Sequence, residues 1–257
     1  MTPRILVIAG SDSSGGAGIQ ADLKTAQAFG VYAQTAVTAV TVQDTRGVSQ
    51  VHPVPADVVA AQIKAALDDI GADVIKIGML ATAEIATAVA DLLETNDIPL
   101  VLDTVLLSSS GAPLLDEAGI TVLKKRLIRR ARLMTPNLPE VEALTGIYPG
   151  SEHRVRNAAM VFKMLGNEAV LFKGGHGESE MIRDVLWADG EFIDFEAPRQ
   201  DTPHTHGTGC TLATAIACGL AQSRSLQDAV ARAHTYVQQA IKTAPGLGQG
   251  HGPLNHS

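Results

Sequence analysis

The segment at residues 4–30, "RILVIAGSDSSGGAGIQADLKTAQAFG", places a short apolar run before a glycine-rich loop and a helical pattern. A short apolar run that ends at turn residues is typical of a buried strand. A strand followed by a helix is the repeating unit of parallel sheets, because the helix carries the chain back to the same edge in a right-handed crossover. This segment therefore predicts an α/β fold.

The same alternation recurs along the chain, and the stretch between "TAVTAVTVQ" and "PADVVAAQIKAALDDI" is predicted to be a loop. The segment 184–198, "DVLWADGEFIDFEAP", differs because two alternating runs flank Asp189-Gly190, which predicts an antiparallel hairpin. We expect a single domain over residues 1–257, built on a doubly wound, mostly parallel sheet with helices on both faces. The further predicted strands begin the segments "DVIKIGM", "LVLDTV", "ARLMTPN" and "EAVLFKGG".

Composition limits the classes of function. The chain has 257 residues and a net charge of −7, which argues against a nucleic-acid surface because such surfaces need clustered cations. The basic run at 124–132 has helical spacing around Leu127 and Ile128, so we interpret it as a solvated helix face. Apolar runs are too short for a signal peptide or a membrane span. Cys210 and Cys218 lie about 12 Å apart on one predicted helix, too far for a disulfide, so we expect a reduced, cytoplasmic protein.

Unusual residues gather where the predicted strands end. In a doubly wound sheet, ligands bind outside the carboxyl ends of the strands. Six consecutive ends carry polar or glycine residues, which predicts one ligand site at that edge of the sheet. These ends are Gly10 to Asp12, Gln43 to Thr45, Gly78-Met79, Asp103-Thr104, Thr135 to Asn137, and Lys173 to His176.

Several of these ends suggest a role. The loop at 10–18 fits neither a dinucleotide fingerprint nor a phosphate-binding P-loop, yet its four glycines allow a ligand close approach to the backbone. Asp103 is a candidate metal or water ligand, although an Asp that begins a loop is common. "KGGH" at 173–176 places a cation beside two glycines, which suits a triphosphate. In "TPNLPE" at 135–140, Asn137 and Glu140 form a helix-capping pattern.

The stretch "HGTGCTLATAIA" at 206–217 carries the most specific signal. Gly207 and Gly209 allow several N–H groups to face one point at a helix N-terminus, which predicts an anion hole. A thiol at a helix N-terminus has a lowered pKa, so Cys210 is expected to be a thiolate near neutrality. A base beside an anion hole suits phosphoryl transfer to an alcohol. Cys218 lies in an apolar helical stretch and is expected to be structural, as His52, His153 and His234 are expected to be surface or packing residues.

Taken together, these motifs resemble the hydroxymethylpyrimidine/phosphomethylpyrimidine kinases of thiamine biosynthesis, a family within the ribokinase-like superfamily. The resemblance runs in order from residue 5 to about residue 256. It is carried by "IAGSDSSGGAGIQADLKT", "KIGML", "VLDTV", "TPNLPE", "KGGH", "THGTGCT" and "GQGHGPLNH".

The resemblance implies Mg²⁺- and ATP-dependent phosphorylation of 4-amino-5-hydroxymethyl-2-methylpyrimidine, and then of its monophosphate to the diphosphate. It also implies a frequent homodimer. It places Gly10, Asp22, Gln43, Met79 and Cys210 around the pyrimidine, and Asp103, Asn137, Glu140 and Lys173 at Mg²⁺ and the ATP phosphates. The amides of Thr208, Gly209 and Cys210 would form the anion hole.

Two other functions fit part of this pattern. A pyridoxine or pyridoxal kinase on the same scaffold also phosphorylates a hydroxymethyl group on an aromatic ring, and Cys rather than Asp at position 210 favours the pyrimidine. A pyrimidine-binding module without catalysis would not require Asp103, Lys173 and Cys210 together. The chemistry of the residues agrees with the pyrimidine, because the amide of Gln43 offers both a donor and an acceptor and Met79 offers a polarizable sulfur to a flat ring.

Overall fold

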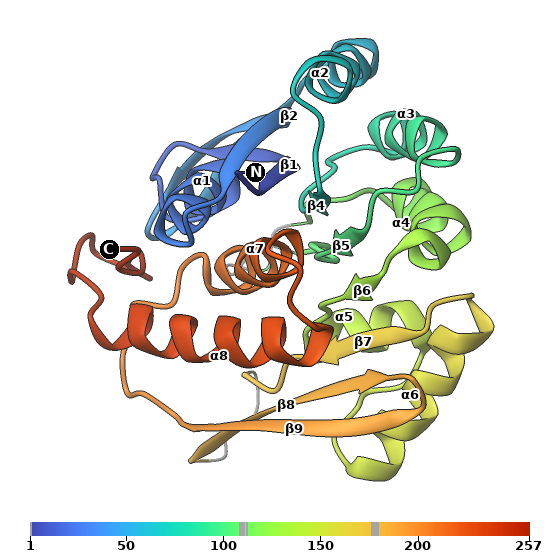
Figure 1. Ribbon diagram of the computed structural model, residues 1–257. Coiled ribbons are helices and arrows are strands. Elements are labelled where there is room, and N and C mark those ends of the chain that lie inside the picture. Colours follow the sequence, from blue (N-terminus) through green and yellow to red (C-terminus); the bar gives the residue numbers. More distant parts are fainter. Residues whose placement is uncertain (1, 108–110, 112, 176–179) are drawn as a thin grey trace.

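One mixed sheet of nine strands organises the part of the chain that the structure describes, which comprises residues 2–107, 111, 113–175 and 180–257 of this computed structural model (Figure 1). The strand order is β3-β2-β1-β4-β5-β6-β7-β8-β9. Neighbours from β2 to β7 run parallel, whereas β3, β8 and β9 pair antiparallel. The strands are β1 Arg4–Asp12, β2 Tyr32–Asp44, β3 Gly47–Pro53, β4 Val74–Ile77, β5 Leu100–Leu102, β6 Leu133–Met134, β7 Ala169–Phe172, β8 Met181–Ala188 and β9 Glu191–Pro198.

Helices cover both faces of this sheet (Figure 1). The apolar residues of α2, α3, α4, α5 and α6 join one buried cluster, and those of α1, α7 and α8 join another. β1 shows why, since Leu6 and Ile8 belong to the first cluster while Ile5 and Val7 belong to the second, as the two-residue period of a strand requires. The helices are α1 Gly18–Ala28, α2 Ala56–Asp69, α3 Ala83–Leu93, α4 Glu117–Val122, α5 Leu138–Thr145, α6 Glu152–Met164, α7 Thr208–Ala221 and α8 Leu226–Lys242.

The predicted doubly wound α/β fold is confirmed. The chain leaves β1 to form β2 on one side and later returns to form β4 on the other, so the sheet has its topological switch point at β1. The predicted hairpin is also present, with positive φ at Asp189 and Gly190, as a type I′ turn requires. None of the described helices is both long and apolar enough to span a membrane.

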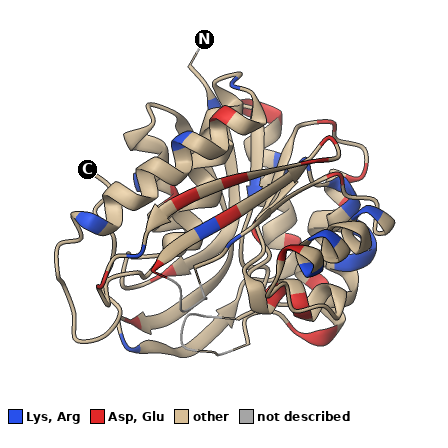
Figure 2. Cartoon of the chain, turned by 90° about the horizontal axis from the view of Figure 1, so that it is seen from below, with Lys and Arg blue, Asp and Glu red and all other residues tan. Residues whose placement is uncertain are grey.

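The loop predicted before α2 is partly wrong, because residues 47–53 form β3 and pair antiparallel with β2. Most of β3 is exposed, so backbone hydrogen bonds hold it rather than burial, and no apolar alternation marks it in the sequence. The basic run at 124–132 follows α4 as a turn of π-helix and a turn of 3₁₀-helix. Its Leu127 and Ile128 are buried, whereas Arg126 pairs with Asp91 of α3 and with Glu94 just after that helix. Figure 2 colours the basic and the acidic residues along the chain, and both kinds occur on neighbouring helices.

A buried ion pair joins α1 to the centre of the sheet. Nζ of Lys76 on β4 lies 2.9 and 3.0 Å from the two carboxylate oxygens of Asp22, and both side chains are fully buried. The hydroxyl of Thr214 on α7 donates to the same carboxylate at 2.6 Å. α1, β4 and α7 are therefore fixed to one another by three hydrogen bonds shielded from water.

This pair yields a stability prediction. Asp22→Ala should lower the free energy of unfolding by about 3–5 kcal/mol, because it leaves the Lys76 ammonium buried without a counter-charge. The double variant Asp22→Leu/Lys76→Met removes both charges at similar volume and should lose much less. Urea denaturation measures both values. A single variant as stable as the parent protein would show that Lys76 finds another partner.

Candidate active site

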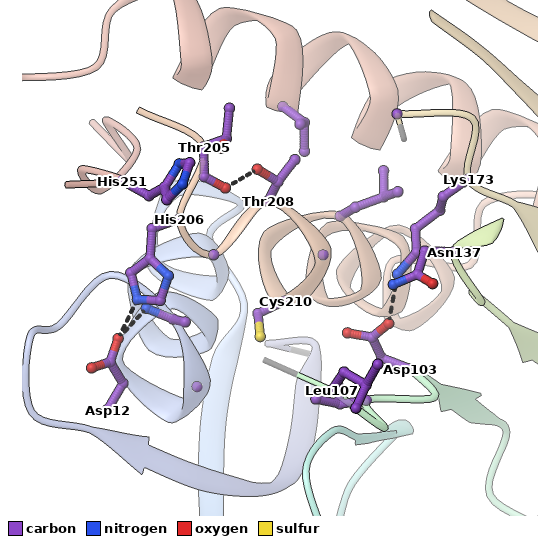
Figure 3. A pocket seen from close by; sticks show the side chains of 18 of the residues that line it. Asp12, Asp103, Leu107, Asn137, Lys173, Thr205, His206, Thr208, Cys210 and His251 are labelled. Carbon is purple, nitrogen blue, oxygen red and sulfur yellow. Dashed lines mark hydrogen bonds and ion pairs between the residues drawn. The ribbon is translucent and has the colours of Figure 1, made fainter. Parts of the chain in front are cut away.

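A cavity of about 640 Å³ opens at the carboxyl ends of the parallel strands. All but one of the residues to which the family resemblance assigns a role line it, as Figure 3 shows for several of them. Cys210 lies between two polar ends, with His206 and Asp12 on one side and Asp103, Lys173 and Asn137 on the other. The predicted residues that line the cavity are Gly10, Gln43, Met79, Asp103, Asn137, Glu140, Lys173, Thr208, Gly209 and Cys210; His176 lies outside the described residues.

Asp22 is the exception, and its predicted contact with the ring is wrong. Its side chain has no exposed surface and does not line the cavity. Both of its oxygens are bound to Lys76, and one also accepts from Thr214. The helical pattern places Asp22 correctly on α1 but cannot show that Lys76, 54 residues later, lies opposite it. Asp22 therefore lies outside the cavity and holds α1 against β4 and α7.

Two glycines allow close backbone contacts around the loop after β1, one with the start of α7 and one within the loop itself. Gly207 has a φ of 87°, and a Cβ at this position would lie 1.8 Å from the carbonyl oxygen of Gly16. Gly18 has a φ of 56°, and a Cβ there would lie 2.3 Å from the carbonyl oxygen of Gly10. Any other residue would push these segments apart. The glycine-rich loop thus shapes the protein's own backbone around the cavity.

Two of the three amides predicted to form an anion hole are free among the described residues. α7 begins without a side-chain cap, and the amides of Gly209 and Cys210 have no acceptor among the described residues. The amide of Thr208, by contrast, donates to the carbonyl of Thr205 at 3.3 Å, and its hydroxyl donates to the same oxygen. Two free amides at the positive end of a 14-residue helix remain available to an anion.

The state of Cys210 differs from the prediction. Burial, together with the carboxylates of Asp22 and Asp103, raises the pKa of its thiol to about 11, although Lys76 and the amide of Gly18 act in the opposite direction. Cys210 is therefore a neutral thiol near pH 7. The helix terminus favours the thiolate, but the loss of water and two nearby negative charges outweigh it. Cys218 is fully buried in α7, as predicted.

One polar end of the cavity is an acid–base pair. Oδ1 of Asp103 accepts from Lys173 Nζ at 3.0 Å and from the Thr135 hydroxyl at 2.9 Å. Burial alone would raise the pKa of Asp103, but the charges of Lys173 and Lys76 have the larger combined effect and hold this pKa below its usual value. Position 209 lies close by, since a Cβ there would be 3.4 Å from Lys173 Nζ and 3.6 Å from Asp103 Oδ2. The start of α7 thus lies beside this pair.

Beside this pair, the predicted capping pattern is confirmed. The Asn137 side chain accepts from the Glu140 amide, and the Glu140 carboxylate accepts from the Asn137 amide, each at 2.9 Å. Thr104 donates to the same Glu140 oxygen, Oε2, at 3.1 Å. Burial raises the pKa of Glu140, while the Lys173 ammonium opposes that rise. Glu140 therefore caps α5 and also lines the cavity.

The other polar end contains residues to which the sequence analysis gave no role. Asp12 ends β1, and its carboxylate accepts from His206 Nε2 at 2.8 Å. His206 Nε2 also lies 3.4 Å from the side-chain amide nitrogen of Gln43. Asp12 and His206 each lie close to a glycine that the sequence analysis singles out, Gly10 and Gly207. The pairing of Asp12 with His206, however, joins residues 194 positions apart. Only the fold reveals it.

A second pair, Asp184 and His234, lies in the half of the cavity near α8. Oδ1 of Asp184 on β8 accepts from the Gly174 amide at 2.8 Å, and Oδ2 lies 4.0 Å from His234 Nε2. Burial raises the pKa of Asp184. His234 is buried and packs against Phe195, as a packing residue should, but it also lines the cavity; His52 and His153 are exposed, as predicted.

Comparison with known proteins places the chain in a family. Residues 12–255 match the family described as phosphomethylpyrimidine kinase. The hydroxymethylpyrimidine/phosphomethylpyrimidine kinase of Haemophilus influenzae is 46% identical, over 98% of this chain and 96% of that protein.

Two solved structures show the same fold. Pyridoxal kinase of Bacillus subtilis, solved as an ADP complex, aligns with a TM-score of 0.91 at 35% identity, over 100% of this chain and 98% of that one. Phosphomethylpyrimidine kinase of Clostridium difficile aligns with a TM-score of 0.82 at 38% identity, over 93% and 99%. With a family match across nearly its whole length and a relative this similar, the chain belongs to the phosphomethylpyrimidine kinase family, on the ribokinase-like fold.

Proposed function

We propose that this protein transfers the γ-phosphoryl group of ATP to the hydroxyl of 4-amino-5-hydroxymethyl-2-methylpyrimidine, and then to the resulting monophosphate. The observation that carries the proposal is the position of the free amides of Gly209 and Cys210 between two different ends of one cavity. One end offers the amide of Gln43 and the sulfur of Met79, and the other offers the Asp103–Lys173 pair. An acceptor ring and a nucleotide triphosphate would meet at the amides.

At the ring end, contacts are both apolar and polar. Met79 Sδ would lie 3.1 Å from a Cβ on Gly10, so the absence of that Cβ lets the sulfur and the backbone share one wall. The Gln43 amide supplies a donor and an acceptor, which an aminopyrimidine edge requires. Cys210 presents an uncharged thiol between this wall and the phosphate end.

At the phosphate end, the proposal assigns charge stabilisation to Lys173, Asn137 and Gly209, whereas both donors of Thr208 are already bound to the Thr205 carbonyl. In each transfer the acceptor oxygen bonds to the γ-phosphorus, the bond to the bridging oxygen breaks, and ADP leaves. Negative charge develops on the transferred oxygens, and fixed donors nearby stabilise it. Asp103 and Glu140 raise the pKa of Lys173 although burial lowers it, which keeps the ammonium charged.

The donor set at this end fits Mg²⁺. Within the described residues no three acidic, His or Cys side chains form a metal cluster, but Mg²⁺ commonly uses one or two carboxylates and completes its shell with water and phosphate oxygens. Within the part of the chain that the structure describes, Asp103 and Glu140 each keep one oxygen without a protein donor, Oδ2 and Oε1. We propose that these carboxylates hold Mg²⁺, which would neutralise phosphate charge when bound.

Analysis of the products tests the function directly. With ATP and Mg²⁺, we expect the purified protein to convert hydroxymethylpyrimidine to its monophosphate and then to the diphosphate. Pyridoxal is the second candidate acceptor, favoured by the TM-score of 0.91 to a pyridoxal kinase. Comparable kcat/KM values for pyridoxal would establish both activities, and no turnover of either acceptor would refute the proposal.

Residues 1–257 are proposed to act as one catalytic domain, since the sheet and cavity draw on segments from both ends of the chain.

The protein is proposed to form a homodimer, with a solution mass twice the 26.8 kDa of the chain. Val40 and Val42 on β2 are about half exposed, which supports such an interface.

A reducing, cytoplasmic location is also proposed, because the thiols of Cys210 and Cys218 are free.

The Mg²⁺ assignment yields a prediction. Asp103→Asn should raise the Mg²⁺ concentration needed for half-maximal turnover by about tenfold or more, because it removes one of two proposed anionic ligands. Thr135→Val is the matched control, since it deletes a hydrogen bond to Asp103 but keeps both carboxylates. If the Mg²⁺ titration of Asp103→Asn overlays that of the parent protein, Asp103 does not hold the metal.

The raised pKa of Cys210 yields a prediction about pH. With a pKa of about 11, only about one thiol in 10⁴ is ionised at pH 7, which cancels the 10²–10⁴-fold gain that a general base provides. If Cys210 accepts the hydroxyl proton, the single-turnover rate of the first transfer should rise about tenfold per pH unit between pH 7 and 9.5. Cys210→Ala should abolish this rise while costing less than about tenfold at pH 7.

The second transfer and a second cysteine provide the controls. A phosphate monoester is already largely ionised at pH 7, so the second transfer should show no such rise. Cys218→Ala deletes a thiol from the same helix away from the cavity and should leave both pH profiles unchanged. A large loss in Cys210→Ala that is the same at every pH would instead show that the thiol acts by packing.

A further inference from the structure

The hydrogen bonds around Asp12 fix which nitrogen of His206 carries a proton. The Asp12 carboxylate is almost fully buried and accepts from five donors: the amides of Ser14, Gly16 and Ala17, the hydroxyl of Ser14, and Nε2 of His206. A carboxylate surrounded by donors is ionised and can only accept. At 2.8 Å, His206 Nε2 must therefore donate to it, whether the ring is neutral or charged.

This proton constrains the neighbouring Gln43. With Nε2 of His206 committed as a donor, a side-chain NH₂ group 3.4 Å away has nothing to donate to there, and two donors face each other. At the other side of the amide, the Thr41 hydroxyl lies 3.0 Å from Gln43 Oε1 and 3.0 Å from the Ser11 carbonyl. Thr41 has one proton for these two acceptors.

A half-turn of the amide removes both conflicts without moving any other atom. The Gln43 oxygen then accepts from His206 Nε2, and the Gln43 nitrogen donates to the Thr41 hydroxyl, which donates in turn to Ser11. Oxygen and nitrogen of a side-chain amide are assigned from such hydrogen-bond accounting. In this orientation alone, each contact in the chain from Asp12 to Ser11 joins a donor to an acceptor.

We propose that the Asp12–His206 pair is a specificity device that holds the Gln43 amide with its oxygen on the His206 side and its nitrogen on the Thr41 side. Asp12 and His206 act as positioning residues, because they work through Gln43. The fixed order of acceptor and donor selects a ring edge whose exocyclic group donates and whose adjacent ring nitrogen accepts. This step rests on the proposed function, since it takes an aminopyrimidine as the ligand.

The 4-oxo analogue presents the reverse order, because its exocyclic oxygen accepts and its ring N–H donates. Gln43 could match it only by turning its NH₂ group back against the His206 N–H. A site that leaves buried polar groups unpaired rejects a ligand strongly, as hydrogen-bonding sites reject analogues that lack the matching group. The protein should therefore favour the 4-amino compound over its 4-oxo analogue.

The tautomer can be observed without any substrate. Long-range ¹H–¹⁵N spectra of the histidine-labelled protein, with the His206 signals assigned by their loss in His206→Asn, should show a protonated Nε2. Nuclear Overhauser contacts should connect the Gln43 NH₂ protons to the Thr41 methyl group. A neutral His206 ring with an unprotonated Nε2, or NH₂ contacts to the His206 ring instead, would overturn the proposal whether or not the protein phosphorylates the pyrimidine.

Selectivity tests the consequence. Asp12→Asn lets the residue at position 12 donate to His206, so His206 Nε2 can accept and Gln43 can turn. The ratio of kcat/KM for the 4-amino compound to that for the 4-oxo analogue should fall about tenfold or more, while the KM for ATP stays unchanged. Ser14→Ala is the matched control, because it removes one donor to the carboxylate but leaves the carboxylate itself, and its ratio should equal that of the parent protein.

The possible outcomes separate the two proposals. Equal losses for both acceptors in Asp12→Asn would mean that Asp12 only shapes the loop, and the specificity device would be refuted. Failure of the parent protein to phosphorylate either pyrimidine would refute the proposed function, while the spectra would still decide the orientation of Gln43.

Discussion

The site depends on one buried carboxylate. Asp12 lies at the end of β1, and its five hydrogen bonds tie the glycine-rich loop to itself and to His206, which immediately precedes the turn into α7. A buried charge without partners would cost several kcal/mol, whereas these donors hold the pKa of Asp12 at about 2 in spite of its burial. The first loop and the start of α7 can therefore separate only by exposing that charge.

Charge balance within the cavity explains why the thiol of Cys210 stays protonated. Lys76 is committed to Asp22 behind Cys210, and Lys173 is committed to Asp103 beside it. Each cation already has a carboxylate partner, so the lowering effect of Lys76 on the pKa of the thiol is outweighed by burial and by the charges of Asp22 and Asp103. A loose phosphoryl-transfer transition state demands positioning and charge stabilisation more than proton removal. Under the proposed function, the free amides of Gly209 and Cys210 and the ammonium of Lys173 would supply that stabilisation.

Much of this arrangement is visible in the sequence, and the remainder is missing for physical reasons. Strand ends in a parallel sheet converge on one edge, so the amino-acid order alone assigns Gly10, Gln43, Asp103 and Lys173 to one site. Pairings across the fold leave no local pattern, which is why the expected partner of Asp22 is the ring rather than Lys76. The predicted thiolate at Cys210 is wrong for a related reason, because a helix terminus is readable from sequence and the burial of a side chain is not.

The neutral thiol also explains how one cavity can serve two acceptors of different charge. The first acceptor is an uncharged alcohol, and the second is a phosphate monoester that carries about −1.5 to −2 charges at pH 7. A carboxylate at position 210 would face that monoester within a cavity that already holds Asp103, and like charges so close repel strongly where water is scarce. A protonated cysteine adds no charge, and its backbone amide still donates to an anion. Under the proposed function, the burial that disfavours a thiolate base is thus the condition that admits the phosphorylated intermediate as the second substrate.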